Sequence, residues 1–542
     1  MAMDNQKPGP GGPRRGPPPG GKGPPPGGKG GSPKFKLVDQ EGDMGPPQLG
    51  SPGGRRKNPA PELKYSFEIP PAPIPAEQIS QVFNADVIVV GGGMAGMSAA
   101  LRATEKGAKT ILIERSETFQ SRGGDNAYIG TRLQKKYGIE IDIDEVLLNL
   151  VKHGANKPDQ RLLRLLISKG AEVSDWLFDM TDAAGINFTI TGYPPPSNWN
   201  PKAEWYPQYL ACHAAEGGEP LVVECIMNNG LKKGVTMHFN TRGKQLLRNS
   251  SGKVTGIVAQ KTTGEYVQYN AARAVVLATG DIGNNSEMMA KYAPQVQYLS
   301  SKLTGSTGDG HQMCMWLGAQ TQRDFGAPVT HGFPGPLGPD AFLQVNRLGE
   351  RFQNEDLTGQ SYTNQVEKQP GQDAWQVFDS KYREQLPAMG IGHGKVSAYR
   401  EGLQESIDEQ CKKADTIDEL AKLMEVPVDT FKATIKRYNE LAHKGKDLDF
   451  AKRADRLFPV ENPPFYACKG TYEMLVVFWG VTVNTELKPL GSDWKPIPGL
   501  FVAGNVLGNR FSVDYPLMCP GLTHAMATTS GFIAGTNAAT IG

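Results

Sequence analysis

The sequence lacks the features that define several classes of protein. No run of about 18 or more apolar residues occurs, so no membrane-spanning helix is predicted. Lysine and arginine total 58 against 56 acidic residues, a net charge of +2 that has none of the basic excess typical of nucleic-acid-binding proteins. Arg14-Arg15 resembles a twin-arginine signal, but glycine and proline follow where an apolar stretch is required. We therefore expect neither a nucleic-acid partner nor a membrane span.

Cysteine is scarce and scattered. No two of the six cysteines form a CxxC pair, and "ACHA" at 211–214 lacks the second cysteine of a haem attachment site. Zinc, iron–sulfur and c-type haem sites therefore have no support in the sequence, and no metal site is predicted. Isolated cysteines in a long chain favour reduced thiols, which predicts a cytoplasmic location.

Residues 1–80 differ in composition from the rest of the chain. They hold 19 of the 42 prolines, and "GPPPGGKG" at 16–23 recurs without its first residue at 24–30. Such a segment buries too little apolar surface to fold, which predicts a disordered tail. The first 36 residues carry seven basic residues and one acid. The tail is therefore either a solvated linker or a docking segment for an acidic partner.

A β-α-β unit follows the tail. "ADVIVV" at 85–90 predicts a buried strand, Gly91-x-Gly93-x-x-Gly96 a glycine turn that opens a helix, and "KTILIER" at 109–115 a second strand. Glycines at this spacing bring backbone N–H groups against a pyrophosphate at a helix N-terminus. Glu114 ends the second strand, where an acid binds a ribose 2′-hydroxyl. The unit predicts a site for FAD or NAD rather than NADP.

Further motifs extend this pattern: "SRGGDNAYIG" at 121–130, "LATGDIGN" at 277–284, "TGDGHQM" at 307–313, "VNRLGERFQNE" at 345–355 and "FVAGN" at 501–505. Together with the glycine turn they resemble the flavoprotein family of fumarate reductases and succinate dehydrogenases. That family includes urocanate reductases and 3-ketosteroid dehydrogenases, and the resemblance covers roughly residues 84–542.

The resemblance implies an α/β fold with a Rossmann-like FAD-binding domain and an inserted α+β cap that binds substrate. The FAD-binding domain would comprise residues 82–315 and 471–542, and the cap residues 316–470. The implied cofactor is non-covalent FAD, with the helix after Gly521 facing the flavin. The residues implied to bind it are Gly91, Gly93, Met94, Ala95, Gly96, Glu114, Arg115, Gly123, Gly124, Asn126, Thr279, Gly280, Asp309, Gly504, Asn505, Gly521 and Leu522.

The family's clamp for a dicarboxylate is missing from the matching positions. Fumarate reductases place an arginine four residues after the glutamate of "RFxNE", a histidine before the strand that ends in "VNT", and an arginine twelve residues after the alanine of the "AG-acid" motif. Here these positions fall on Gly359, on about Val476 and on Tyr515. Burying a dianion without cationic partners costs several kcal/mol per charge, roughly, so the sequence argues against fumarate as the substrate.

Tyr515 resembles the tyrosine of the Tyr-Pro pair in 3-ketosteroid dehydrogenases, which carry a second tyrosine in the cap. The nearest cap tyrosine here is Tyr362, three residues beyond Gly359. A tyrosine hydrogen-bonds a carbonyl on which negative charge builds, or protonates the α-carbon. We therefore expect a small unsaturated substrate that is a bulky enone, ketosteroid-like or an aromatic enoate. Phe478 and Trp479 would meet its bulk, unless they are ordinary core residues.

Alternatives remain at this point. Tyr515 could be structural, and a carboxylate-specific reductase could use a relocated arginine such as Arg510 or Arg347. A protein that binds FAD without catalysis is the alternative outside enzymes. His311 is expected to cap its helix, His524 to pack or to lie near the flavin, and Arg351 and Glu355 to be structural. Because no haem or iron–sulfur motif is present, electrons would pass to or from a separate donor or acceptor.

Overall fold

The main sheet contains seven strands. It runs in the order β6-β2-β1-β9-β8-β7, and β16 also pairs with β9. The parallel strands are β6 (Thr236–His238), β2 (Thr110–Ile113), β1 (Ile79–Val90), β9 (Tyr266–Leu277) and β16 (Leu500–Val502). β8 (Val254–Lys261) and β7 (Thr241–Arg248) extend the sheet in antiparallel orientation. Residues 87–90 are all buried, as expected for a parallel strand covered on both faces.

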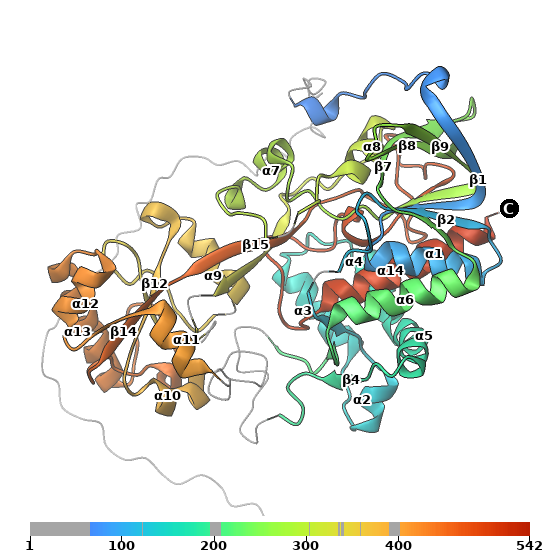
Figure 1. The fold of residues 1–542 in the computed structure, drawn as a ribbon. Helices are drawn as coiled ribbons and strands as arrows, with labels where there is room; N and C mark the ends of the chain where they lie inside the picture. The colour runs from blue at the N-terminus through green and yellow to red at the C-terminus, as the bar shows by residue number, and fades with distance from the viewer. Residues whose placement is uncertain are drawn as a thin grey trace, which may run out of the picture. The chain divides into compact units, whose positions relative to one another are not determined.

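Helices cover this sheet. α1 (Met94–Glu105) follows β1 directly, and α14 (Leu522–Thr540) and α6 (Glu219–Lys233) pack against it (Figure 1). α5 (Gly170–Ala183) packs against both α14 and α6. Within the described ranges, none of the helices has both the length and the apolarity needed to cross a membrane. The same part of the chain contains α2 (Arg132–Lys136), α3 (Ile143–His153), α4 (Gln160–Ser168), α7 (Ser286–Tyr292), α8 (Asp309–Trp316) and the small sheet of β3 (Asp125–Ala127), β5 (Cys212–Ala215) and β4 (Phe188–Ile190).

A second, antiparallel sheet lies in the middle of the chain. Its order is β11 (Leu343–Val345), β12 (Trp375–Asp379), β14 (Phe465–Lys469) and β13 (Cys411–Ala414). The helices of this region are α9 (Gly359–Val366), α10 (Tyr382–Met389), α11 (Leu403–Gln410), α12 (Ile417–Met424) and α13 (Val428–Lys444). The helical periodicity at 416–445 is confirmed as two helices separated at Pro427. After β14 the chain continues into β15 (Thr471–Phe478), which pairs with β10 (Ala327–Phe333) (Figure 1).

The structure is a computed structural model, and it describes residues 65–121, 123–195, 207–302, 304–333, 336–337, 341–357, 359–389 and 402–541. The mixed α/β fold with a Rossmann-like sheet agrees with the sequence prediction. Most of the predicted tail, residues 1–64, lies outside the described residues. The short 3-10 turns are η1 (Ser66–Glu68), η2 (Ala76–Gln78), η3 (Pro294–Val296), η4 (Pro370–Gln372), η6 (Ala454–Arg456) and η7 (Gly504–Val506).

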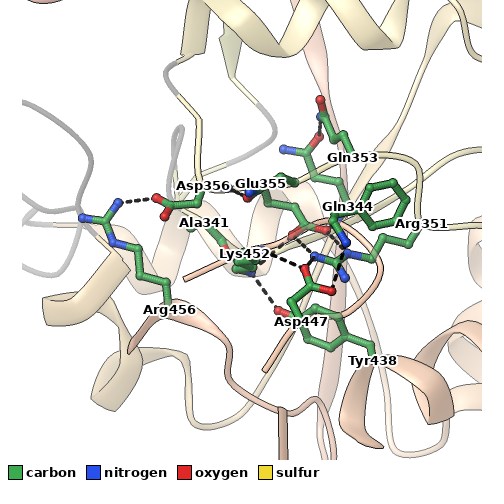
Figure 2. A network of polar contacts seen from close by, with 12 residues as sticks. Ala341, Gln344, Arg351, Gln353, Glu355, Asp356, Tyr438, Asp447, Lys452 and Arg456 are labelled. Carbon is green, nitrogen blue, oxygen red and sulfur yellow. Dashed lines mark hydrogen bonds and ion pairs between the residues drawn. The ribbon is translucent and has the colours of Figure 1, made fainter. Parts of the chain in front are cut away.

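A buried ionic network holds the second sheet to its helices (Figure 2). Arg351 donates to Glu355 at 2.8 Å and to Asp447 at 2.8 Å, and Lys452 lies 3.4 Å from Glu355. The side chains of Glu355 and Lys452 are fully buried. Removing one partner of a buried pair leaves an uncompensated charge and costs about 3–5 kcal/mol. These contacts support the structural role predicted for Arg351 and Glu355.

The start of the folded chain was predicted too late. The sequence predicts a tail up to residue 80, but residues 65–80 include η1, η2 and the first residues of β1. Phe67 is 3 % exposed and packs in a cluster with Met288 and Trp479. Its carbonyl oxygen accepts a hydrogen bond from the Trp316 indole at 2.9 Å. The sequence prediction rested on the proline-rich composition of the whole segment. Composition does not reveal the contribution of one buried aromatic side chain, Phe67, which attaches the segment to the core.

We expect Phe67→Ala to lower the free energy of unfolding by about 3–5 kcal/mol, because it empties a filled apolar site. Ile69→Ala is the matched control, since that side chain is 55 % exposed and its removal should change stability by less than about 0.5 kcal/mol. Denaturant unfolding compares the two variants. Equal stability of both would show that the segment contributes nothing to the core.

Candidate functional site

An elongated cavity of about 640 Å³ connects the first turn of the main sheet with the N-terminus of α14 and with β15. Three sets of residues line it. The first set surrounds the glycine turn after β1, the second lies at the ends of β2 and β7, and the third lies near α14 and β15. Among the described residues, no group of three or more histidine, cysteine, aspartate or glutamate side chains could hold a metal ion.

The glycine turn brings two backbone segments unusually close together. A Cβ atom on Gly91, whose φ is +111°, would lie 2.3 Å from the carbonyl oxygen of Ala278. A Cβ atom on Gly96 would lie 1.9 Å from the carbonyl oxygen of Gly91. No side chain caps the N-terminus of α1, which begins at Met94 on the cavity wall. Its free N–H groups and the helix dipole therefore suit a pyrophosphate.

The end of β2 carries an anchored carboxylate. Glu114 is 4 % exposed, and its two oxygens accept hydrogen bonds from the backbone N–H groups of Gly92 (2.5 Å) and Ser116 (2.9 Å). Both bonds fix the carboxylate on the cavity wall, where a ribose hydroxyl can donate to its remaining lone pairs.

A partly exposed ion pair also lines the cavity. Both carboxylate oxygens of Asp309 accept from the Arg242 guanidinium at 2.7 Å. Burial alone would raise the pKa of Asp309, but the hydrogen bonds and charge of Arg242, together with the Thr307 hydroxyl and the charge of Arg115, hold the pKa below its usual value. Arg115 donates to Gly305 O and Thr307 Oγ1. This part of the cavity wall is thus polar.

Tyr515 also lines the cavity. Its ring packs against Phe511 and Phe478, with ring centroids 5.3 Å and 5.6 Å away, and its hydroxyl oxygen accepts from the Thr523 N–H at 3.3 Å. Burial raises the pKa of Tyr515, so the phenol is protonated and keeps a hydrogen to donate. Apolar side chains of Val329, Leu475, Val476 and Leu517 also line the cavity.

Two more titratable residues line this wall: Glu219, which the sequence did not indicate, and His524, for which a place near the flavin was one of two expectations. Glu219 is 1 % exposed; its Oε2 accepts from the Asn126 amide at 2.8 Å, while its Oε1 has no hydrogen-bond partner. Burial raises the pKa of Glu219. His524 Nδ1 donates to Asp125 O at 2.7 Å, because a carbonyl oxygen only accepts. A single acid after a Gly-Gly pair carries no sequence signal, so only the fold could identify Glu219.

Most of the residues predicted to bind the cofactor line the cavity, namely Gly91, Gly93, Met94, Ala95, Glu114, Arg115, Gly123, Gly124, Thr279, Gly280, Asp309, Gly504, Asn505 and Gly521. The other three predicted cofactor residues do not line the cavity. Gly96 allows the close turn, Asn126 holds Glu219, and Leu522 is buried in the main core.

The predicted substrate residues are less well placed. Trp479 is fully buried, stacks on Tyr292 and donates its indole N–H to Gln322 O at 3.1 Å. Phe478 lies behind Tyr515 in the core. The Tyr362 hydroxyl donates to Glu355 O at 2.7 Å, and the ring is fully buried. None of the three is among the cavity-lining residues, so core packing accounts for each of them.

Arg510 is buried beside the cavity rather than in its wall. It donates to Leu507 O at 3.2 Å and to Asn505 Oδ1 at 3.1 Å, while its Nη1 has no hydrogen-bond partner. Burial lowers its pKa to about 10. The guanidinium lies over the Phe478 ring, 5.2 Å from its centroid. Arg510 thus reaches the cavity only through Asn505. Arg347 is half exposed and pairs with Asp373.

These features fit a flavin dinucleotide. The uncapped helix N-terminus suits the pyrophosphate, Glu114 the ribose, and the elongated cavity leads from there to a partly apolar end with an unpartnered acid oxygen. The fold and cavity define a dinucleotide-binding flavoprotein. Residues 86–519 match the family model described as "FAD binding domain". The chain belongs to this family, so FAD is its cofactor and oxidoreduction its class of chemistry.

Relatives with assigned activities share most of the chain. It is 30 % identical over 478 residues to a probable fumarate reductase of Shewanella frigidimarina, covering 84 % of this chain and 74 % of the relative. It is 27 % identical to the vinyl phenol reductase of Lactiplantibacillus plantarum, covering 82 % and 95 %. The open conformation of a flavocytochrome c3 fumarate reductase superimposes with a TM-score of 0.65 at 28 % identity, covering 86 % of this chain and 79 % of that one.

We expect Glu114→Gln to weaken FAD binding about 10- to 100-fold, because an amide NH2 would replace one of two oxygens that accept from backbone N–H groups. Glu117→Gln is the control, since that side chain is exposed on the same segment. Fluorescence titration of the apoprotein with FAD measures both dissociation constants. An unchanged constant for Glu114→Gln would remove this residue from the site.

Glu219 should make stability depend on pH. Its raised pKa means that the folded protein keeps a proton that the unfolded chain loses above about pH 4.3, so the free energy of unfolding falls as the pH rises toward the folded pKa. Glu219→Gln removes this loss and should gain stability relative to wild type as the pH rises above about 5. Denaturant unfolding at several pH values measures it, with exposed Glu224→Gln as the control. Parallel profiles for both variants and wild type would contradict the assignment.

Proposed function

We propose that this protein is an FAD-dependent oxidoreductase that reduces, or forms, a carbonyl-activated C=C bond. The observation that carries the proposal is the place of Tyr515, a protonated phenol on the cavity wall between apolar side chains. FAD, held non-covalently, would supply hydride exchange between its N5 and a carbon of the double bond. The cavity residues bind and orient the substrate and provide the proton.

Tyr515 is the proton donor in this proposal. Its oxygen accepts from the Thr523 N–H, so its own hydrogen is free to point toward a substrate carbonyl or α-carbon. The neighbouring Asp514 accepts from Ser361 (3.1 Å) and Asn364 (3.0 Å) of α9 and bonds His153. These contacts fix the loop that carries Tyr515, which limits the motion of the phenol.

The substrate is proposed to be a bulky enone, a ketosteroid-like compound or an aromatic enoate. Among the described residues, the arginines that line the cavity are Arg115 and Arg242. Arg242 pairs with Asp309 and Arg115 donates to Gly305 O and Thr307 Oγ1, so both guanidinium groups already bond the protein rather than a substrate dianion. The relative from Lactiplantibacillus plantarum, a vinyl phenol reductase, supports an aromatic substrate.

The second candidate function is carboxylate reduction of the fumarate type. Two observations favour it: the relative at 30 % identity is a probable fumarate reductase, and Arg510 keeps one unpartnered nitrogen behind Asn505. In this case Asn505 or a rearranged Arg510 would bind the carboxylate. Electrons are proposed to come from, or go to, a separate carrier. We retain residues 82–315 and 471–542 as the FAD-binding domain and 316–470 as the cap.

We expect Tyr515→Phe to slow turnover about 10²- to 10⁴-fold while FAD content stays unchanged, because the variant loses only the proton donor. Tyr362→Phe is the matched control and should keep nearly full activity, since that hydroxyl bonds Glu355 O. The measurement is the anaerobic rate at which a cyclic enone reoxidises the dithionite-reduced flavin. Full activity of Tyr515→Phe with an inactive Arg510→Ala would instead support the carboxylate reductase.

The substrate class has its own test. The same assay, run with cyclic enones, ketosteroids, aryl acrylates and fumarate, should show fast reoxidation only with the bulky compounds. Fast reoxidation by fumarate alone would overturn the proposed substrate and leave the second candidate. A protein that purifies without FAD and binds none would contradict both.

A further inference from the structure

Two of the six cysteines face each other in the second sheet. In the antiparallel pair of β13 and β14, Cys411 is the register partner of Cys468. Directly opposed residues project from the same face of a sheet, with Cα atoms about 4.5 or 5.5 Å apart according to the type of pair. Both values fall within the range of roughly 4.4–6.8 Å that a disulfide spans. A disulfide therefore requires no movement of either strand.

We propose that Cys411 and Cys468 are a redox-active dithiol that closes to a disulfide when it reacts with a hydroperoxide. Both thiols are free in the structure. Cys411 is partly exposed, so an oxidant can reach the pair, while Cys468 is buried beside it. The Cys468 thiol also donates to the carbonyl oxygen of Gln410, the residue before Cys411, at 3.6 Å.

The electrostatics of the pair favour reaction. The thiol of Cys411 hydrogen-bonds the sulfur of Cys468; this bond lowers the pKa of Cys468 and raises that of Cys411. Cys468 is thus the more acidic thiol of the pair and the one that forms a thiolate more readily, which favours it as the nucleophile. The remaining four cysteines, Cys212, Cys225, Cys314 and Cys519, are buried. Burial raises the pKa of each of these four thiols.

The reaction balances with one peroxide. One thiol, as its thiolate, attacks an oxygen of the peroxide; the O–O bond breaks, the sulfur becomes a sulfenic acid, and the departing hydroxide takes up the proton that the thiol had released, which gives the first water. The second thiol attacks that sulfur, forms the S–S bond and releases the second water. Two thiols are oxidised by two electrons in total, and hydrogen peroxide is reduced to two waters. A thiol reductant reverses the change.

The disulfide would join an edge strand to the strand that leads into the cavity. β13 is the last strand of its sheet, and β14 is followed through Gly470 by β15. Leu475 and Val476 of β15 line the cavity beside Tyr515. Closure would therefore tie α11 and β13 to the strand that supports the cavity wall.

The experiment exposes the holoenzyme to hydrogen peroxide, blocks remaining thiols with N-ethylmaleimide, and maps peptides by mass spectrometry without reduction. We expect a Cys411–Cys468 cross-linked peptide that disappears after dithiothreitol, with the four buried cysteines still alkylated after unfolding. Cys225→Ser, the control, should form the same cross-link. Cys411→Ser should form none, and Cys468 should then accumulate a sulfenic acid that dimedone labels.

Two results would overturn the proposal. The first is that Cys411 and Cys468 both remain alkylated in the wild-type protein at peroxide levels that oxidise other cysteines. The second is a cross-link that joins either residue to a different cysteine. Both are determined on the unmodified chain, so neither depends on whether a variant folds.

Discussion

The close packing of α14 on α1 is the contact on which the cavity depends. A Cβ atom on Gly531 would lie 2.2 Å from the carbonyl oxygen of Ala95, and one on Gly535 would lie 2.3 Å from that of Ala99. Only glycine lets the two helices approach so closely. At the start of α14, a Cβ atom on Gly521 would lie 2.5 Å from the backbone of Asp125 at the start of β3. The cavity wall therefore combines segments that lie far apart in the sequence.

This dependence explains what the sequence could predict. The β-α-β unit was predictable because its strands, glycine turn and helix lie within about 30 residues, and their periodicity is local. Glu219 was not, because nothing in its own segment shows that it reaches the same wall as His524. The predicted roles of Trp479 and Tyr362 in substrate binding and catalysis gained no support. A large aromatic side chain suits a core as well as a pocket, and in the structure both side chains are buried in the core.

Buried ionisable groups are treated differently beside the second sheet and on the cavity wall. In the second sheet, buried arginine and lysine side chains meet carboxylates, so Arg351 and Lys452 both contact Glu355 (Figure 2). On the cavity wall, by contrast, Glu219 and Tyr515 favour their neutral forms because burial raises both pKa values. Buried neutral groups of this kind stabilise a polar, uncharged ligand better than a dianion, which connects the electrostatics to the proposed substrate.

The most direct test of the account is a crystal structure of the holoenzyme with a saturated cyclic ketone, which binds as a product would. The account predicts the ketone oxygen within about 2.6–3.2 Å of the Tyr515 hydroxyl, with the rest of the ligand against Val329, Leu475 and Val476. A ketone oxygen bound instead by Arg510, or a ligand outside this end of the cavity, would contradict the assignment of Tyr515 as the residue that activates the substrate.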